Sequence, residues 1–302
     1  MSMTVISPTA SAPAEKRRIP AGNTATGWLK VIALLFMFID HSGKVLFGDV
    51  EEMRVLGRIA FPLYLWCMVV GFQRTRSVPR YLLRILVVGL VSQPLYLFAL
   101  DYEPHLSTLA MNVVEPLSSV FRGNGGSFLP ALLQVLNRVF LAKPNIFLTL
   151  FLGLCALWGI REKKYLSHLW APAAALCLAI VLNADYGWKG VAVLIMIYAV
   201  RDSRPGIAAV MIAFFLYWGT SYPIITSLFG LDLHTSNLPK ALDWLGTLIK
   251  AVMRKETLAL LGLPLILIRF PWDLKMPRWL GYALYPGHLA LLMVLKVIFF
   301  GL

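Results

Sequence analysis

Long apolar segments, separated by short polar ones, constrain this chain more than any other feature of its sequence. They lie at about 27–47, 55–73, 81–100, 144–160, 167–183, 187–200, 206–222, 257–270 and 279–301. A bilayer core about 30 Å thick requires about 20 apolar residues per helix, and fewer where neighbouring helices bury the ends. The pattern therefore predicts an all-α, polytopic bundle of about nine transmembrane helices, within a range of about eight to eleven.

The composition excludes a soluble domain. Of the 302 residues, 59% are apolar and 14% are charged, whereas soluble chains have about 45–50% and about 25%. One soluble core of this length cannot bury so much apolar surface, so the solvent must be largely lipid. The cysteines, Cys67, Cys155 and Cys177, lie in apolar stretches and leave one unpaired, which excludes a disulfide scaffold.

The basic residues indicate the orientation of the chain. The net charge is +13, but the lysines and arginines are scattered between apolar segments, so we expect no nucleic acid partner. Clusters in the N-terminal tail and in alternate connections fall on one side, which the positive-inside rule places in the cytoplasm. These clusters are Lys16, Arg17 and Arg18; Arg74, Arg76, Arg80 and Arg84; Arg161, Lys163 and Lys164; Arg201 and Arg204; and Arg269, Lys275 and Arg278.

We divide the chain into a tail and one membrane domain. Residues 1–25 are rich in Ser, Thr, Pro and Ala, and we expect a short disordered cytoplasmic tail rather than a cleaved signal peptide, because no apolar region precedes its basic cluster. Residues 26–302 form the multi-spanning domain. Its long connections, 101–143 and 223–256, face outward and carry amphipathic runs that we interpret as interfacial helices. A tenth or eleventh span there is the alternative.

Polar and ionisable groups at membrane depth cost several kcal/mol, so we interpret them first as functional. The clearest are Asp40, His41, Arg58 and His288. The predicted topology places them between the midplane and the outer face, and therefore predicts one polar cavity that opens outward. Weaker candidates for contacts with a substrate are Asn145, Asp185, Tyr186 and Tyr285.

Asp40 and His41 are adjacent, and adjacent side chains on a helix point about 100° apart. Either the chain unwinds at Ser42-Gly43, or each residue has its own partner on another helix. Arg58 is the natural ion-pair partner of Asp40, and histidine suits acid–base chemistry near neutral pH. The alternatives are a purely structural ion pair and histidines that only pack. We expect no metal, because no close-spaced ligand motif supports one.

Short motifs that recur in order along the chain resemble the TraX family. They extend from residue 28 to residue 296, and the family usually has an apolar residue in place of Ser42 and Leu in place of Gly287. The connection 101–143 is also longer than the resemblance leads us to expect. The motifs are Leu29-Lys30-Val31-Ile32-Ala33 followed by Asp40-His41-Ser42-Gly43, Gly57-Arg58-Ile59-Ala60-Phe61-Pro62 followed by Gly71-Phe72, Asn145-Ile146-Phe147-Leu148-Thr149-Leu150, Asp185-Tyr186-Gly187-Trp188, and Tyr285-Pro286-Gly287-His288-Leu289.

The TraX family is named for the inner-membrane enzyme of conjugation systems that acetylates the pilin N-terminus. It also looks related to the transmembrane acyltransferases that use acyl-CoA, including the acyltransferase-3 family. The resemblance implies a multi-pass acetyltransferase of the bacterial inner membrane, with a cytoplasmic N-terminus and acetyl-CoA as co-substrate. It implies that the acceptor is a pilin or another cell-envelope molecule, such as a glycan or a lipid.

The resemblance also implies roles for the polar residues. His41 is the base for the acceptor, Asp40 and Arg58 fix the cavity, and His288 polarises the thioester carbonyl or protonates the leaving thiolate. The cytoplasmic arginines Arg74, Arg76, Arg80 and Arg84 are either topogenic only, or they also bind the phosphates of a cytoplasmic ligand, which the resemblance identifies as the donor. Two other classes stay open: a transporter or flippase that uses the same cavity, and a structural membrane protein without turnover.

Overall fold

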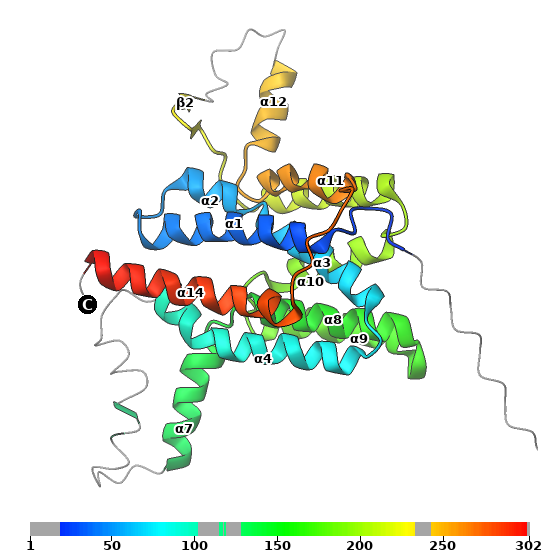
Figure 1. Cartoon of the computed structure of the whole chain (residues 1–302). Helices are drawn as coiled ribbons and strands as arrows, with labels where there is room; N and C mark the ends of the chain where they lie inside the picture. Colours follow the sequence, from blue (N-terminus) through cyan, green and yellow to red (C-terminus); the bar gives the residue numbers. More distant parts are fainter. Residues whose placement is uncertain (1–18, 102–114, 117, 119–127, 233–242, 301–302) are drawn as a thin grey trace, which may run out of the picture.

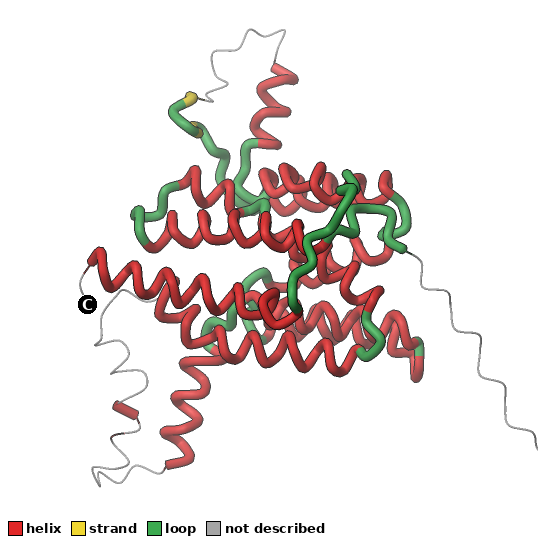
Figure 2. The backbone as a smooth tube through the Cα atoms, viewed as in Figure 1, coloured by secondary structure: helices red, strands yellow, loops and turns green. Residues whose placement is uncertain are grey.

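The computed structural model describes residues 19–101, 115–116, 118, 128–232 and 243–300. Apart from one short hairpin, β1 (Ser227–Leu228) and β2 (Leu231–Asp232), the described elements are helices, as Figure 2 shows. They are α1 (Thr26–Val45), α2 (Glu51–Gly57), α3 (Ala60–Arg74), α4 (Val78–Tyr96), η1 (Leu97–Asp101), α7 (Phe128–Leu136), η3 (Asn137–Leu141), α8 (Ile146–Glu162), η4 (Lys164–Leu166), α9 (Ser167–Val181), α10 (Gly187–Ala199), α11 (Arg204–Gly219), α12 (Asp243–Val252), η7 (Thr257–Gly262), α13 (Leu263–Leu267) and α14 (Arg278–Phe300).

Helix forms in each of the nine predicted apolar segments, so the all-α class is confirmed. Within the part of the chain that the structure describes, four helices are long and apolar enough to cross a membrane: Glu51–Arg74, Val78–Leu100, Lys164–Val181 and Trp279–Phe300. A bent pair, Phe128–Leu141 with Ile146–Glu162, brings the number to five if it forms one span. The predicted count of about nine spans is not confirmed. One reason is length: 13 residues of α10 reach about 20 Å at about 1.5 Å per residue, less than the bilayer core. A second reason is charge, because α1 has 20 residues but carries Lys30, Asp40 and Lys44.

α1, α4, α8 and α14 lie side by side in the bundle, and the long loop before α14 returns the chain to the beginning of α1 (Figure 1). α3 is the buried centre: Leu63, Leu65, Trp66 and Val69 have no exposed surface. Helices in the interior of a bundle are apolar on every side. The lipid-facing helices instead expose large apolar side chains, such as Leu83 and Val91 of α4 and Ile298 of α14.

Both long connections contribute an amphipathic helix that leaves the bundle. α7 and α12 point away from it in opposite directions in Figure 1. The helix formed by α7 and η3 lies at 80° to α8, and it exposes Phe128, Leu129 and Leu133. A helix at a steep angle to a spanning helix, with an exposed apolar face, has the geometry of an interfacial helix. Residues 102–114 and 233–242 of these connections lie outside the described residues.

The bend between η3 and α8 is fixed by two of the polar residues. Asn145 is the N-cap of α8, where its side-chain Oδ1 accepts from the backbone amide of Phe147. Its side-chain Nδ2 donates to the carbonyl of Gly89 at 2.9 Å, while its backbone amide is free to donate to another helix. Gln93 donates to the carbonyls of Val139 and Lys143, both at 2.9 Å, and accepts from the Asn145 amide. Their side chains therefore satisfy the backbone groups that the break releases.

The end of the predicted tail is not disordered. Residues 1–18 lie outside the described residues, but residues 19–25 pack across the bundle, and Asn23 and Ala25 are buried. The indole of Trp66 donates to the carbonyl of Asn23 at 2.6 Å. Arg204 and Arg269 donate to the carbonyls of Ala21 and Gly22. Donors from distant parts of the sequence thus satisfy the backbone of this segment, which the tail prediction of 1–25 did not anticipate.

Candidate functional site

A small chamber brings together five of the eight residues that were predicted as catalytic or as substrate contacts. It has a volume of about 40 Å³ and lies between α1, the break between α2 and α3, and the turn before α10. Asp40, His41, Asp185, Tyr186 and Tyr285 all contribute to its wall. These five predicted residues therefore lie around one common space. Its other lining residues are Met37, Gly57, Ala60, Phe61, Tyr64, Tyr96 and Ile146.

The two histidines contact each other directly. Nδ1 of His41 lies 2.9 Å from Nε2 of His288, and Nδ1 of His288 lies 3.3 Å from the carbonyl oxygen of Leu284. A carbonyl only accepts, so His288 carries its proton on Nδ1 and presents a lone pair at Nε2. When both imidazoles are neutral, His41 then donates from Nδ1, and its own Nε2 is left as a lone pair. The chain of donors thus fixes His41 in the tautomer that a base requires.

This contact assigns His288 a different place from the one expected. His41 lines the chamber, whereas His288 does not line any of the three described cavities. His288 contacts His41 from outside the chamber. The imidazole rings lie nearly parallel, with centroids 5.1 Å apart. His288 is therefore positioned to orient His41 rather than to touch a reacting group.

Asp40 belongs to a buried ion-pair network. Its closest partner is Arg54, whose Nη1 lies 2.8 Å from Oδ1, while Nη2 of Arg58 lies 3.9 Å from the same oxygen. Arg58 instead contacts Glu256 at 3.0 Å. The expected pairing of Asp40 with Arg58 is thus secondary. Burial raises the pKa of Glu256, and the Arg58 guanidinium acts in the opposite direction.

α1 stays helical through Ser42-Gly43 to Val45, so the chain does not unwind next to His41. Asp40 and His41 each have a partner on another element, as the second of our two alternatives required. Two network residues, Arg54 and Glu256, were missed by sequence reasoning. The spacing of Arg54 and Arg58 on one helical face was the available signal for Arg54. For Glu256, its position directly before an apolar segment was the only signal.

The close approach of α2 to α1 depends on Gly57, where an added Cβ would overlap the Asp40 side chain. We expect Gly57→Ala to destabilise the folded protein by about 1–3 kcal/mol, because the core cannot accommodate the methyl group without displacing the ion pair. Thermal unfolding of the purified protein in detergent measures this. Gly287→Ala is the matched control, because no atom lies within 4 Å of a Cβ at that position. Equal shifts for the two variants would contradict the prediction.

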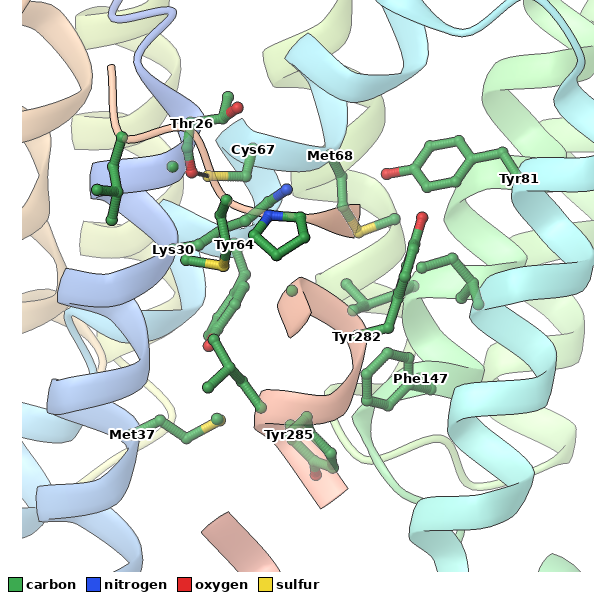
Figure 3. A pocket seen from close by; sticks show the side chains of 18 of the residues that line it. Thr26, Lys30, Met37, Tyr64, Cys67, Met68, Tyr81, Phe147, Tyr282 and Tyr285 are labelled. Carbon is green, nitrogen blue, oxygen red and sulfur yellow. Dashed lines mark hydrogen bonds between the residues drawn. The ribbon is translucent and has the colours of Figure 1, made fainter. Parts of the chain in front are cut away.

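A much larger cavity, of about 440 Å³, adjoins the chamber. Figure 3 shows Thr26, Lys30 and Cys67 at one end of it and Met37 and Tyr285 at the other. Four residues line both spaces: Met37, Tyr64, Ile146 and Tyr285. The two spaces therefore meet end to end along α1.

The predicted donor-binding arginines do not line this cavity. Arg74 donates to the carbonyl of Thr24 at 3.2 Å, and Arg76 and Arg80 are exposed. Arg84 donates from Nε to the hydroxyl of Tyr282 at 3.1 Å, and Tyr282 is a lining residue. Arg84 thus holds a lining residue, Tyr282, without lining the cavity itself. Asn145 likewise lies outside the chamber and lines a separate apolar groove of about 160 Å³ between α4 and α8.

The family model described as "TraX protein" matches residues 25–118 and 131–296. The chain belongs to the TraX family. The matched residues include every polar side chain of the chamber and both histidines of the contact. The resemblance seen in the short motifs is therefore confirmed.

A curated relative extends this comparison. The "Probable fimbrial assembly protein FimC, serogroup H1" of Dichelobacter nodosus is 35% identical over 79 residues, which are 25% of this TraX-family chain and 32% of that protein. The match thus spans about a third of the relative's length. No solved structure matches the chain.

Proposed function

We propose that this protein is an acetyltransferase that moves an acetyl group from cytoplasmic acetyl-CoA to an amine or hydroxyl group on the outer side of the bacterial inner membrane. The observation that carries the proposal is the 2.9 Å contact from Nδ1 of His41 to Nε2 of His288 at a chamber lined by polar side chains, which leaves Nε2 of His41 to act as the base. The alternating basic connections support a cytoplasmic N-terminus. Membership of the TraX family and the fimbrial relative favour a pilin as the acceptor.

The described residues fit an acetyl-CoA donor. The 440 Å³ cavity is of the size that small-molecule sites have, and it shares four lining residues with the chamber. Bound acetyl-CoA would supply an activated acyl group with a thiol as its leaving group. The charged and polar lining of the cavity is suited to holding the remainder of such a molecule.

In this reaction His41 takes the proton from the acceptor at Nε2 while the acceptor atom bonds to the thioester carbonyl carbon. As the C–S bond breaks, the same Nε2 returns that proton to the departing sulfur. An α-amine has a pKa of about 7.7–8.0, so part of it is already neutral and a modest base suffices. The resulting imidazolium keeps its Nδ1 proton directed at Nε2 of His288, which in turn is held by the carbonyl of Leu284. Asp40 and its arginine partners hold the chamber wall through the ion-pair network.

The orienting role of His288 predicts that glutamine can partly replace it. The side-chain oxygen of His288→Gln can still accept from Nδ1 of His41, whereas His288→Ala leaves Nδ1 without an acceptor. We therefore expect the alanine variant to lose about tenfold to a hundredfold in transfer, and the glutamine variant to recover most of it. The pH dependence of the transfer rate distinguishes an orienting role from a packing role. If His288 orients His41, the alanine variant should also shift the part of the rate–pH curve that follows protonation of His41. Equal losses with unshifted profiles would show a packing role only.

The proposed function is tested with purified protein in detergent, isotope-labelled acetyl-CoA and a pilin subunit from the same organism. Mass spectrometry of the pilin should find one added acetyl group, located by fragmentation. If acetyl-CoA binds but neither pilin nor an envelope extract is acetylated, the transferase proposal fails. The two cavities joined end to end would then be tested as a transport path in proteoliposomes.

A further inference from the structure

We propose that the 440 Å³ cavity holds the pantetheine arm of the donor, with Lys30 and Lys275 binding its phosphates and the shared residues directing its thioester to His41. This assignment rests on the proposed function. It names the residues that recognise the donor, and it transfers this task from the predicted arginines to two lysines.

The charges at one end of the cavity support this assignment. Lys30 and Lys275 both line it, and no described contact gives either lysine an ion-pair partner. In Figure 3 the side chain of Lys30 extends along the rim of the cavity toward Cys67. One carboxylate, Asp273, lies at the same end, where its Oδ1 accepts from the amide of Gly27 at 2.8 Å at the beginning of α1. Two lysines against one carboxylate leave this end with a net positive charge. This end therefore presents two lysines that can bind phosphate.

The distance along α1 matches the ligand. His41 lies eleven positions after Lys30 on one continuous helix, which gives about 16 Å at about 1.5 Å per residue. The pantetheine arm has about a dozen single bonds between phosphate and sulfur, and an extended chain of that length spans about 14 Å. Phosphates bound at Lys30 thus leave the thioester at the depth of His41.

The lining between the two ends suits an arm of amides and methyl groups. Tyr64, Tyr81, Tyr282 and Tyr285 bring hydroxyl groups into the wall, and Met68, Ile85 and Leu150 bring apolar surface. The hydroxyls can bond the amides of the arm, and the apolar side chains can pack against its methyl groups. At the far end the cavity narrows to the shared residues and the 40 Å³ chamber. Only the acyl end of the ligand fits there.

Cys67 allows this site to be probed independently of activity. It lines the cavity, and its Sγ lies 3.9 Å from the carbonyl of Thr26 (Figure 3). The full-length protein in detergent is treated with N-ethylmaleimide, with and without excess acetyl-CoA, which has no free thiol. Mass spectrometry then compares modification of Cys67 with that of Cys155 and Cys177. We expect acetyl-CoA to slow modification of Cys67 alone.

A double variant tests the lysines. In Lys30→Gln/Lys275→Gln, the acetyl-CoA concentration needed for half protection should rise about tenfold or more. Lys163→Gln/Lys164→Gln removes two lysines that do not line the cavity, and it should leave the concentration unchanged. Equilibrium binding of radiolabelled acetyl-CoA to the same variants gives a second reading that does not depend on the reactivity of Cys67.

The outcomes separate this inference from the proposed function. Protection of Cys67 without acetyl transfer to any acceptor would leave the site standing and overturn the transferase. Transfer without protection, or equal acetyl-CoA affinity in the two double variants, would overturn the site. The absence of binding by folded wild-type protein would overturn both.

Discussion

Replacing His41 by alanine is expected to lower acetyl transfer by about a hundredfold to ten-thousandfold, which is the usual contribution of a positioned general base. His41 is the chamber residue whose lone pair the structure fixes, through His288 and the carbonyl of Leu284. No other described histidine lines the chamber. Initial rates with saturating acetyl-CoA and pilin measure the loss.

Two controls show whether a loss of transfer comes from the missing base rather than from damage to the fold or to donor binding. His168→Ala removes a histidine of α9 that lies outside the described cavities, and it should transfer at the wild-type rate. The His41 variant should still show protection of Cys67 by acetyl-CoA, because the donor cavity does not include His41. A His41 variant that transfers at more than about a tenth of the wild-type rate would remove His41 from the mechanism.

Removing Glu256 alone is expected to destabilise the protein by about 3–5 kcal/mol, because it leaves Arg58 as a buried cation without its closest partner. The two side chains are only 2% and 12% exposed, and their charged atoms lie 3.0 Å apart. Asp40 does not compensate, since its oxygen lies 3.9 Å from Arg58 and already contacts Arg54. The thermal unfolding temperature of Glu256→Ala in detergent should fall by several degrees or more.

A double variant distinguishes lost charge pairing from lost packing. Replacing both partners by apolar residues, as in Arg58→Leu/Glu256→Leu, removes the uncompensated charge, and it should recover much of the stability that Glu256→Ala loses. Asp40 keeps Arg54 in this variant. If the double variant is less stable than Glu256→Ala, the pair acts through packing and hydrogen bonds rather than through charge.

The positions of the helices were readable from the sequence because helix formation in lipid is a local requirement. Every backbone amide in an apolar medium must find its partner within the segment, so an apolar run of sufficient length is already a helix. Observed bounds agree with the predicted segments to within a few residues at most ends: 27–47 became Thr26–Val45, and 279–301 became Arg278–Phe300. The class of protein follows from the same argument.

The number of spans was not readable in this way. Hydropathy does not register where a helix bends by 80° at Asn145 or ends after 13 residues. These features depend on contacts from other helices, such as Gln93, which satisfies the backbone at the bend.

The sequence by itself determined which side chains are too costly to place in lipid without a purpose, and so it named Asp40, His41, Arg58 and His288. Only the tertiary structure decided how they pair. His41 meets His288 across 247 positions, and Arg58 meets Glu256 across 198. The physical reason is that the free-energy cost of burying a polar group is a property of the residue itself. The hydrogen bond or ion pair that offsets this cost depends on which distant helix lies beside the residue.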